Sequence, residues 1–294
     1  MLKLKTLLLG ALVMLASGVA TAQSIDFGRG DLPVTVPENY SSETPTPLIV
    51  LLHGYGSTGA GQDSYLGFSR VADRYGFLFV APDGDQEASG RRARFWNATD
   101  ACCDFSGADN GDSDYIHGII NKMKDEYNVD SSRVYLVGHS NGGFMSYQMA
   151  YLHSNDIAAI ASLAGASHYE TRDAPGNPIH VLQIHGTNDT TIVYEGGDIQ
   201  DNSYPSAMET VTQWATYNGC STEGAGRELR DLESSLDGHE SEVILFEIGC
   251  DAGGSAELWT IKDGSHVPRV SETFSSQVVE WLYAHPKASE SYSD

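Results

Sequence analysis

Short apolar runs and amphipathic segments alternate along most of this chain. Continuous apolar runs are typical of strands buried on both faces of a parallel sheet, and apolar residues at helical spacing predict helices that cover it. The pattern predicts central strands at residues 47–52, 77–81, 134–137, 157–163, 179–184, 242–248 and 256–261. It also predicts edge strands within residues 23–38, a helix behind the turn at residues 138–142, and helices at residues 65–75, 113–127, 208–217 and 270–283. We therefore expect an α/β fold with a mostly parallel central sheet flanked by helices.

The glycine-rich turn behind residues 134–137 suggests a catalytic nucleophile. Its sequence, Gly138-His139-Ser140-Asn141-Gly142, fits the G-x-S-x-G pattern, in which a serine occupies a sharp turn between a strand and a helix. Glycines flank such a serine because the strand and the helix approach too closely for a Cβ. Ordinary turns also fit this pattern by chance, so the prediction that the serine is a nucleophile depends on partners elsewhere in the chain.

A second group of polar residues, HGTND at residues 185–189, follows the predicted strand at 179–184. In open α/β sheets, ligands and catalytic groups gather at the carboxyl ends of the strands. Asp189 is therefore the predicted acid of a Ser-His-Asp triad. The alternatives Asp198 and Asp201 lie further along the loop, away from any predicted strand end.

The choice of the general base rests on chain order, because α/β-hydrolases carry the serine, the acid and the histidine in that sequence. This order leaves His239, His266 and His285. His239 lies in a polar turn and His285 on an outward tail, whereas His266 lies between a predicted strand and the last predicted helix, so His266 is the predicted base. His139 and His185 adjoin the motifs but are badly placed to accept the serine proton, and we expect packing or hydrogen-bonding roles for them.

The loop after residues 47–52 begins with His53-Gly54-Tyr55. In a nucleophile-elbow enzyme, this loop supplies one backbone amide of the oxyanion hole, and the residue after the nucleophile supplies the other. The predicted amides are those of Tyr55 and Asn141. The triad and these amides suffice for hydrolysis through an acyl-enzyme, so we expect no metal or organic cofactor.

Candidate substrate contacts come from the long polar loop at residues 82–111. A loop of this length in a compact domain is usually functional or disordered. Phe95 and Trp96 are expected either to line an aromatic acyl pocket or to pack the loop itself. His139, beside the nucleophile, is a further candidate for a substrate contact.

The chain has 294 residues, enough for one large α/β domain. It opens with two lysines, an apolar run at residues 7–16 and an A-x-A pattern at residues 20–22, as a cleaved secretory signal does. We therefore expect residues 1–22 to be removed and residues 23–294 to form one exported catalytic domain. The net charge of −23 disfavours nucleic acid and anionic membranes as partners. The expected partner of this domain, which we take to be a monomer, is an ester substrate.

Four cysteines in an exported chain predict disulfides, and three connectivities can be drawn for Cys102, Cys103, Cys220 and Cys250. Pairing Cys220 with Cys250 is favoured because each ends or follows a predicted element within one region. That choice leaves Cys102 and Cys103 as a vicinal pair. The cysteine spacing does not suit zinc, and the acidic cluster at residues 109–114 lacks the spacing of an EF-hand loop. We expect capping and solvation there, with Asp112 capping the helix at 113–127.

A resemblance to a known family joins these motifs. The family is that of the polyhydroxybutyrate depolymerase-like esterases, which includes bacterial feruloyl and acetyl-xylan esterases. The segments that resemble it, in order and over most of the chain, are LIVLLHGYGSTG, GFLFVAPDGD, RVYLVGHSNGGFMSYQMA, IHGTNDTTIVYEGG, WATYNGC and GSHV. The resemblance implies an α/β-hydrolase fold, the same catalytic triad and a disulfide between Cys220 and Cys250. Family members usually carry Trp-Pro-Gly after the catalytic histidine, whereas Val267-Pro268-Arg269 stands here, so a relative's substrate cannot simply be transferred.

We expect a secreted carboxylic-ester hydrolase that releases feruloyl or acetyl groups from plant or algal polysaccharide. Enzymes that erode insoluble polyester commonly add a linker and a binding module, whereas a short polar tail at residues 287–294 follows the last predicted helix. Hydrolysis of polyhydroxybutyrate-type polyesters or their oligomers remains the main alternative. A secreted serine peptidase would normally carry a large propeller domain, and a non-catalytic carbohydrate-binding relative would lose the triad.

Overall fold

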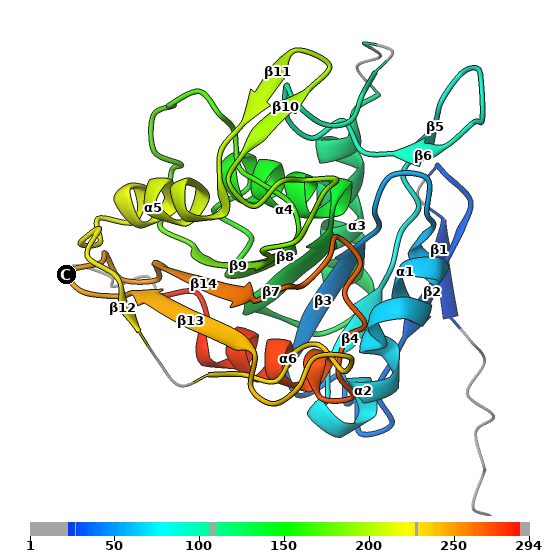
Figure 1. Cartoon of the computed structure of the whole chain (residues 1–294). Coiled ribbons are helices and arrows are strands. Elements are labelled where there is room, and N and C mark those ends of the chain that lie inside the picture. Colours follow the sequence, from blue (N-terminus) through cyan, green and yellow to red (C-terminus); the bar gives the residue numbers. More distant parts are fainter. Residues whose placement is uncertain (1–22, 27, 106, 108–109, 227–228, 289–294) are drawn as a thin grey trace, which may run out of the picture.

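The computed structural model of the chain describes residues 23–26, 28–105, 107, 110–226 and 229–288 (Figure 1). The predicted signal sequence at residues 1–22 lies outside these residues. Within the described part, no helix combines the length and the apolar character that crossing a membrane requires.

A large sheet forms the centre of the structure, with the strand order β1-β2-β4-β3-β7-β8-β9-β14-β13-β12. Strands β4, β3, β7, β8, β9 and β14 run parallel, and the strands beyond them on each side are antiparallel. Their bounds are β1 (Gln23–Asp26), β2 (Asp31–Thr35), β3 (Thr46–Leu52), β4 (Leu78–Val80), β7 (Val129–His139), β8 (Ala159–Leu163), β9 (His180–Gly186), β12 (Ala225–Gly226), β13 (Ser241–Phe246) and β14 (Ser255–Ile261).

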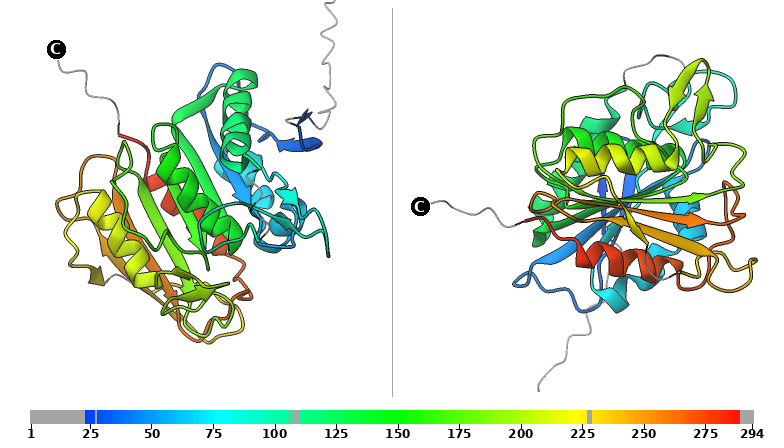
Figure 2. Two further views of the ribbon diagram at one scale, coloured as in Figure 1. Left: turned by 90° about the horizontal axis from the view of Figure 1, so that it is seen from above. Right: turned by 60° about the vertical axis from the view of Figure 1, so that its left-hand side comes forward.

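Helices cover both faces of this sheet (Figure 2). They are α1 (Gly59–Leu66), α2 (Phe68–Tyr75), α3 (Asp112–Glu126), α4 (Asn141–Leu152), α5 (Ala207–Tyr217) and α6 (Phe274–Ala284). The apolar core has two parts, one on each face of the sheet, and alternate residues of β3 point into them. Leu48 and Val50 pack in the part under α3, α4 and α5, whereas Ile49 and Leu51 pack in the part under α2 and α6. Strand β3 is thus buried on both faces, as its continuous apolar run predicts.

Three predicted helices differ from those observed. The helix expected at 270–283 begins at Phe274, because Val270 forms an isolated β-bridge with Glu233 instead. The helix expected at residues 65–75 is two helices, α1 and α2, because Gly67 between them adopts a left-handed conformation with φ of 80°. The helix expected at 113–127 begins at Asp112, whose carboxylate does not cap it. Asp112 is buried, pairs with the Arg29 guanidinium at 2.5 Å and accepts a hydrogen bond from the Asn97 amide at 2.6 Å. Asp109, in the same acidic cluster, lies outside the described residues.

Two small hairpins were not apparent from the sequence pattern. β5 (Asp85–Gln86) pairs with β6 (Arg94–Phe95), and β10 (Gly197–Ile199) pairs with β11 (Asn202–Tyr204). These strands are too short to show a period of two. The hairpins lie in the connections that leave β4 and β9 at their carboxyl ends, and Figure 1 shows β10 and β11 above α4.

Candidate active site

Ser140 sits at the junction of β7 and α4 in a strained conformation, with φ of 54° and ψ of −122°. Non-glycine residues rarely adopt a positive φ, so the surrounding contacts must hold this conformation. The Ser140 amide donates to the Leu163 carbonyl at 2.8 Å, and the Ser140 carbonyl accepts from the Gly143 and Phe144 amides at 2.7 and 3.0 Å. These bonds fix the turn between strand and helix that the G-x-S-x-G pattern predicts.

The glycines of this turn are required by close backbone approaches. A Cβ on Gly138 would lie 2.0 Å from the Gly142 carbonyl oxygen, and a Cβ on Gly142 would lie 2.1 Å from the Leu52 carbonyl oxygen. Both distances are far below van der Waals contact, and the atoms that would be met belong to the backbone. The start of α4 therefore rests directly on the end of β3.

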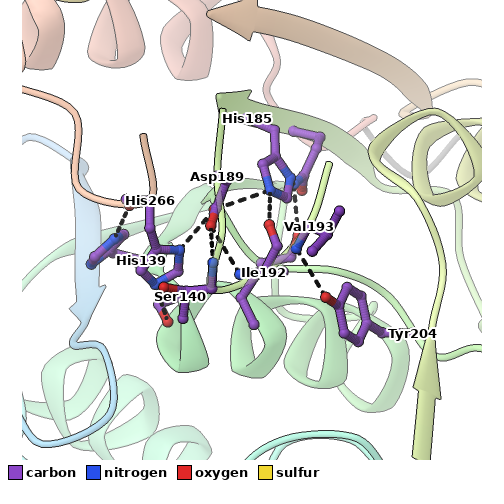
Figure 3. A network of polar contacts seen from close by, with 11 residues as sticks. His139, Ser140, His185, Asp189, Ile192, Val193, Tyr204 and His266 are labelled. Atoms are coloured by element: carbon purple, nitrogen blue, oxygen red, sulfur yellow. Dashed lines mark hydrogen bonds and ion pairs between the residues drawn. The ribbon is translucent and has the colours of Figure 1, made fainter. Parts of the chain in front are cut away.

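The structure brings Ser140, His266 and Asp189 into one hydrogen-bonded line (Figure 3). His266 Nε2 lies 2.9 Å from Ser140 Oγ, and His266 Nδ1 lies 2.7 Å from Asp189 Oδ2. Because a carboxylate only accepts, Nδ1 carries the proton and Nε2 is left to accept the serine hydroxyl. The arrangement can therefore activate the serine as a nucleophile.

The loops that carry the acid and the base are packed against each other. The Asn188 amide donates to the Gly264 carbonyl at 2.9 Å, and a Cβ on Gly186 would lie 2.2 Å from that same oxygen. Tyr65 Oη donates a hydrogen bond to the Pro268 carbonyl at 2.6 Å, which holds the loop of His266 from the other side. The separation of acid and base is thus set by backbone contacts between the loops after β9 and β14.

Asp189 is 4% exposed and is held by four donor groups. Its Oδ1 accepts from the Thr191 and Ile192 amides at 2.8 and 2.9 Å, while Oδ2 accepts from His266 and lies 3.3 Å from His185 Nε2. Burial alone would raise the pKa of the Asp189 carboxyl, but the hydrogen bonds from His185 and His266 outweigh it and hold this pKa well below its usual range. The acid is therefore ionised at neutral pH.

His139 supports the base through the backbone. Its Nε2 donates to the His266 carbonyl at 3.0 Å, and its ring lies 5.6 Å from the Tyr65 ring. Burial lowers the pKa of His139 to about 4, so the ring is neutral at neutral pH. The hydrogen-bonding role expected from the sequence is thus observed, while a side chain only 7% exposed offers little surface to a substrate.

The Tyr55 amide is oriented through the carbonyl of its own peptide unit, that of Gly54. His53 Nε2 accepts from the Gly84 amide at 2.8 Å, so His53 Nδ1 carries the proton and donates to the Gly54 carbonyl, also at 2.8 Å. In a planar trans peptide the N–H points opposite to the carbonyl, so the Tyr55 N–H points away from the His53 ring. A Cβ on Gly54 would lie 3.4 Å from Ser140 Cβ, which puts this loop against the nucleophile.

Asn141 is the first residue of α4, so its amide has no acceptor within the helix. Its side chain is fully buried and pairs with one backbone unit of the long loop: Oδ1 accepts from the Trp96 amide at 2.7 Å, and Nδ2 donates to the Trp96 carbonyl at 2.9 Å. This reciprocal pair ties the loop at 82–111 to the residue beside the nucleophile. Nothing in the local sequence pattern indicates it.

The structure buries the two aromatic residues proposed for an acyl pocket. Trp96 is 0% exposed and donates its indole N–H to the His53 carbonyl at 3.0 Å, and Phe95 is 3% exposed. Both therefore pack the loop, the alternative role given above. Exposed aromatic side chains near this loop include Tyr55 and Phe105, at 41% and 42%, whose ring centroids lie 5.5 Å apart. Sequence reasoning used only the Tyr55 amide and overlooked Phe105.

Both pairs of cysteines form disulfides. Cys220 is bonded to Cys250, as predicted, which joins the end of α5 to the segment after β13. Cys102 is bonded to Cys103, and Cys102 Sγ lies 3.6 Å from the Asn141 side-chain nitrogen. Across the described residues, no three His, Cys, Asp or Glu side chains are grouped closely enough to hold a metal ion.

Three histidines, two of them buried and one half-buried, are expected to make the protein acid-sensitive. Burial lowers the pKa of His139 and His168 to about 4 each and that of His180 to about 3. The unfolded chain, with histidine pKa values of about 6.5, binds more protons in this window, so stability falls as the pH drops from about 6.5 towards 4. Each side chain contributes up to about 3 kcal/mol, and carboxylates with lowered pKa values add to the fall below about pH 5.

Thermal unfolding followed by circular dichroism from pH 7 to pH 4 tests this expectation. The Tm should fall steadily across the window, and His180→Leu, which removes one of the three groups, should make the fall shallower. A Tm that stays constant between pH 7 and pH 4 would contradict the assignment of these rings as neutral in the folded protein.

Comparison with known proteins adds independent information. The sequence pattern that defines the family described as phospholipase/carboxylesterase matches residues 39–240. A bifunctional acetylxylan esterase/xylanase of Neocallimastix patriciarum is 33% identical over 165 residues, which is 56% of this chain and 22% of that protein. Feruloyl esterase B of Piromyces equi is 26% identical over 79% of this chain and 42% of its own length. The match thus spans less than half of either relative.

Feruloyl esterase B of Neurospora crassa is 28% identical, with 72% of each chain covered. Among solved structures, an acetyl xylan esterase from Aspergillus awamori has a TM-score of 0.61 at 19% identity, covering 89% of this chain and 98% of its own. The esterase PE8 has a TM-score of 0.56 at 17% identity, covering 86% and 99%. These structural similarities confirm the predicted α/β-hydrolase fold.

Proposed function

Because the chain belongs to the phospholipase/carboxylesterase family, we propose that it is an exported serine carboxylesterase that releases feruloyl or acetyl groups from plant or algal polysaccharide. The observation that carries this proposal is the hydrogen-bonded line Ser140–His266–Asp189, with the serine on a strained elbow. The relatives named feruloyl esterase and acetylxylan esterase support the choice of substrate.

In the first half of the reaction, Ser140 Oγ attacks the ester carbonyl carbon while His266 Nε2 takes the hydroxyl proton. Asp189 keeps the imidazole in the required tautomer and stabilises its positive charge. The negative charge that develops on the carbonyl oxygen is held by the Tyr55 and Asn141 amides, each worth about 10² to 10³ in rate. The tetrahedral intermediate then collapses, and the alcohol leaves with the proton from His266.

In the second half, water replaces the alcohol. His266 Nε2 removes one proton from the water as its oxygen attacks the acyl carbon. The second intermediate expels Ser140 Oγ, which takes back the proton from His266, and the free acid leaves. The residues named here account for every proton in the cycle.

The Tyr55–Phe105 pair supports an aromatic acyl group as substrate. Tyr55 follows the Gly54 peptide that lies against the nucleophile, and both aromatic side chains are about two-fifths exposed. Exposed aromatic rings bind other flat rings through dispersion and edge contacts, worth about 0.5–1.5 kcal/mol beyond area burial. Tyr55 Oη also donates to Glu87, which holds its ring in place. We propose that this pair contacts the feruloyl ring.

Export is proposed on two observations. The chain opens with the charged, apolar and A-x-A segments of a secretory signal. Its four cysteines are joined in two disulfides, which persist in oxidising compartments.

The proposal is tested by initial rates of the purified protein on a matched panel of substrates. The panel holds methyl ferulate, p-nitrophenyl acetate, 3-hydroxybutyrate oligomers and a peptide p-nitroanilide. We expect methyl ferulate and p-nitrophenyl acetate to be hydrolysed and the anilide to be left intact. Phe105→Ala should lower kcat/KM for methyl ferulate about tenfold and leave that for p-nitrophenyl acetate within twofold, by loss of about one aromatic contact.

Other outcomes would change the assignment. Turnover confined to hydroxybutyrate oligomers would identify a polyester hydrolase, and turnover confined to the anilide would identify a peptidase. If Phe105→Ala lowered both ester rates equally, the aromatic pair would not distinguish acyl groups.

A further inference from the structure

We propose that His185 is a positioning residue, whose Nε2–H donates to the Asp189 carboxylate and fixes its orientation towards His266. The inference rests on the proposed esterase function, in which His185 has no other part. It concerns how the acid is held, since His185 itself touches neither the nucleophile nor the expected position of the substrate.

His185 lies near the carboxyl end of β9, four residues before Asp189 (Figure 3). Its side chain is 2% exposed, and Nε2 lies 2.8 Å from the Ile192 carbonyl oxygen and 3.3 Å from Asp189 Oδ2. The Tyr194 ring packs edge-on against the imidazole, with ring centroids 5.6 Å apart. One N–H group is therefore shared between a carbonyl and the carboxylate of the triad.

The tautomer of His185 follows from its other neighbour, Gln183. Gln183 Nε2 lies 2.7 Å from the Gly165 carbonyl oxygen, and Gln183 Oε1 accepts from Tyr147 Oη at 2.8 Å. Rotating the amide by 180° would set two oxygens against each other, so this orientation is fixed. Gln183 Nε2 is also 3.0 Å from His185 Nδ1, which must then accept its second proton. His185 Nε2 consequently carries the ring proton.

Strand geometry explains why Gln183 and His185 act together. Residues two apart in a strand point to the same face of the sheet, and here that face is covered by α4, which carries Tyr147. Taken as whole residues, Tyr147, Gln183 and His185 are at most 1% exposed. Buried polar groups are tolerated when each has a hydrogen-bond partner. The row Tyr147–Gln183–His185 meets this condition, and it runs from α4 through β9 to the loop that carries Asp189.

The row matters for Asp189 because it supplies the second donor to Oδ2. Oδ1 is held by two backbone amides, whereas Oδ2 has only His266 once His185 is removed. The carboxylate side chain is fully buried, so water does not replace the missing donor. A carboxylate free to turn leaves the imidazolium less well oriented in the transition state, and a displacement of about 1 Å can cost about 100-fold in rate.

A pair of substitutions isolates this donor. In His185→Gln, the side-chain amide nitrogen reaches the place of Nε2 and can donate to Asp189. In His185→Asn, the shorter amide reaches only the place of Nδ1, where it can satisfy Gln183 but not Asp189. Both variants keep a buried polar side chain. We expect kcat to fall about 10- to 100-fold in His185→Asn, with KM within twofold, and to lie within about fivefold of wild type in His185→Gln.

The matched control is His180→Leu, at the other end of the same strand. His180 Nδ1 is hydrogen-bonded to Ser255 Oγ at 2.8 Å, so its loss removes one partly buried polar contact of β9 far from the triad. We expect kcat and KM on p-nitrophenyl acetate to stay at wild-type values in this variant. Active sites are counted by the burst of p-nitrophenol, so that rates refer only to folded enzyme.

The inference is overturned if His185→Asn keeps the wild-type kcat per active site, or if His185→Gln is no faster than His185→Asn. Failure of the proposed function looks different, because wild type itself would then hydrolyse no ester, or Ser140→Ala would keep its activity. The two results are therefore distinguishable in one series of variants.

Discussion

Replacing Ser140 with alanine is expected to lower kcat for ester hydrolysis by about 10⁶-fold. The substitution removes the oxygen that attacks the carbonyl and is hydrogen-bonded to His266 at 2.9 Å. Because alanine keeps the Cβ that serine already accommodates at φ of 54°, it adds no backbone strain. The variant should therefore fold, with a Tm close to that of wild type.

The groups of a triad act as a unit, so further substitutions should add little. The double variant Ser140→Ala/His266→Ala should be no more than about tenfold slower than Ser140→Ala alone. Initial rates on p-nitrophenyl acetate, with mock-purified protein as the background, measure both. If Ser140→Ala keeps more than a trace of activity, another residue is the nucleophile.

Gly142→Ala is expected to damage both stability and catalysis. The added Cβ would lie 2.1 Å from the Leu52 carbonyl oxygen and 2.7 Å from that of His53, so α4 must move away from the end of β3. That movement separates the Asn141 amide from the Tyr55 amide, and losing one oxyanion donor costs about 10² to 10³ in kcat. The overpacking itself should cost about 1–3 kcal/mol of unfolding free energy.

Gly176→Ala is the control for this prediction. A Cβ there would lie 3.8 Å from Ser154 Oγ, an ordinary contact, and Gly176 has no positive φ. Differential scanning calorimetry and initial rates should show the control near wild type on both measures. An unchanged kcat in Gly142→Ala would mean that the two amides do not jointly hold the oxyanion.

The sequence pattern predicted most strands of the large sheet, though not the two-residue β12, because the relevant signals are local. Continuous apolar runs located β3, β8, β9 and β14 to within about two residues at each end, as expected for strands buried on both faces. The nucleophile elbow was equally apparent, because its glycines are required where the backbones of neighbouring elements approach closely. The split at Gly67 could have been foreseen, because a glycine inside a helical pattern weakens the helix there.

What the sequence left open depends on contacts between distant segments. Asp112 fits a helix cap in sequence, yet its carboxylate pairs with Arg29, 83 positions away. Trp96 could equally line a pocket or fill the core, and only its pairing with Asn141, 45 positions away, decides between them. From the sequence, His185 was only a residue next to the motif, because its side-chain partners, which include Gln183 and Asp189, give no periodic signal. Which polar side chains pair with each other in this way depends on the tertiary structure, and a local sequence pattern does not predict it.

The pairing of Asn141 with Trp96 also determines where this enzyme can accept new sequence. The long loop is anchored on one side by this pair and on the other by the short ladder between β5 and β6. The five residues 88–92, at the tip of the hairpin between β5 and β6, are all exposed. Loop tips of this kind tolerate insertion and exchange because few contacts depend on them. Segments grafted at 88–92 would therefore change the exposed tip of this hairpin while the pair of Asn141 with Trp96, beside the nucleophile, stays in place.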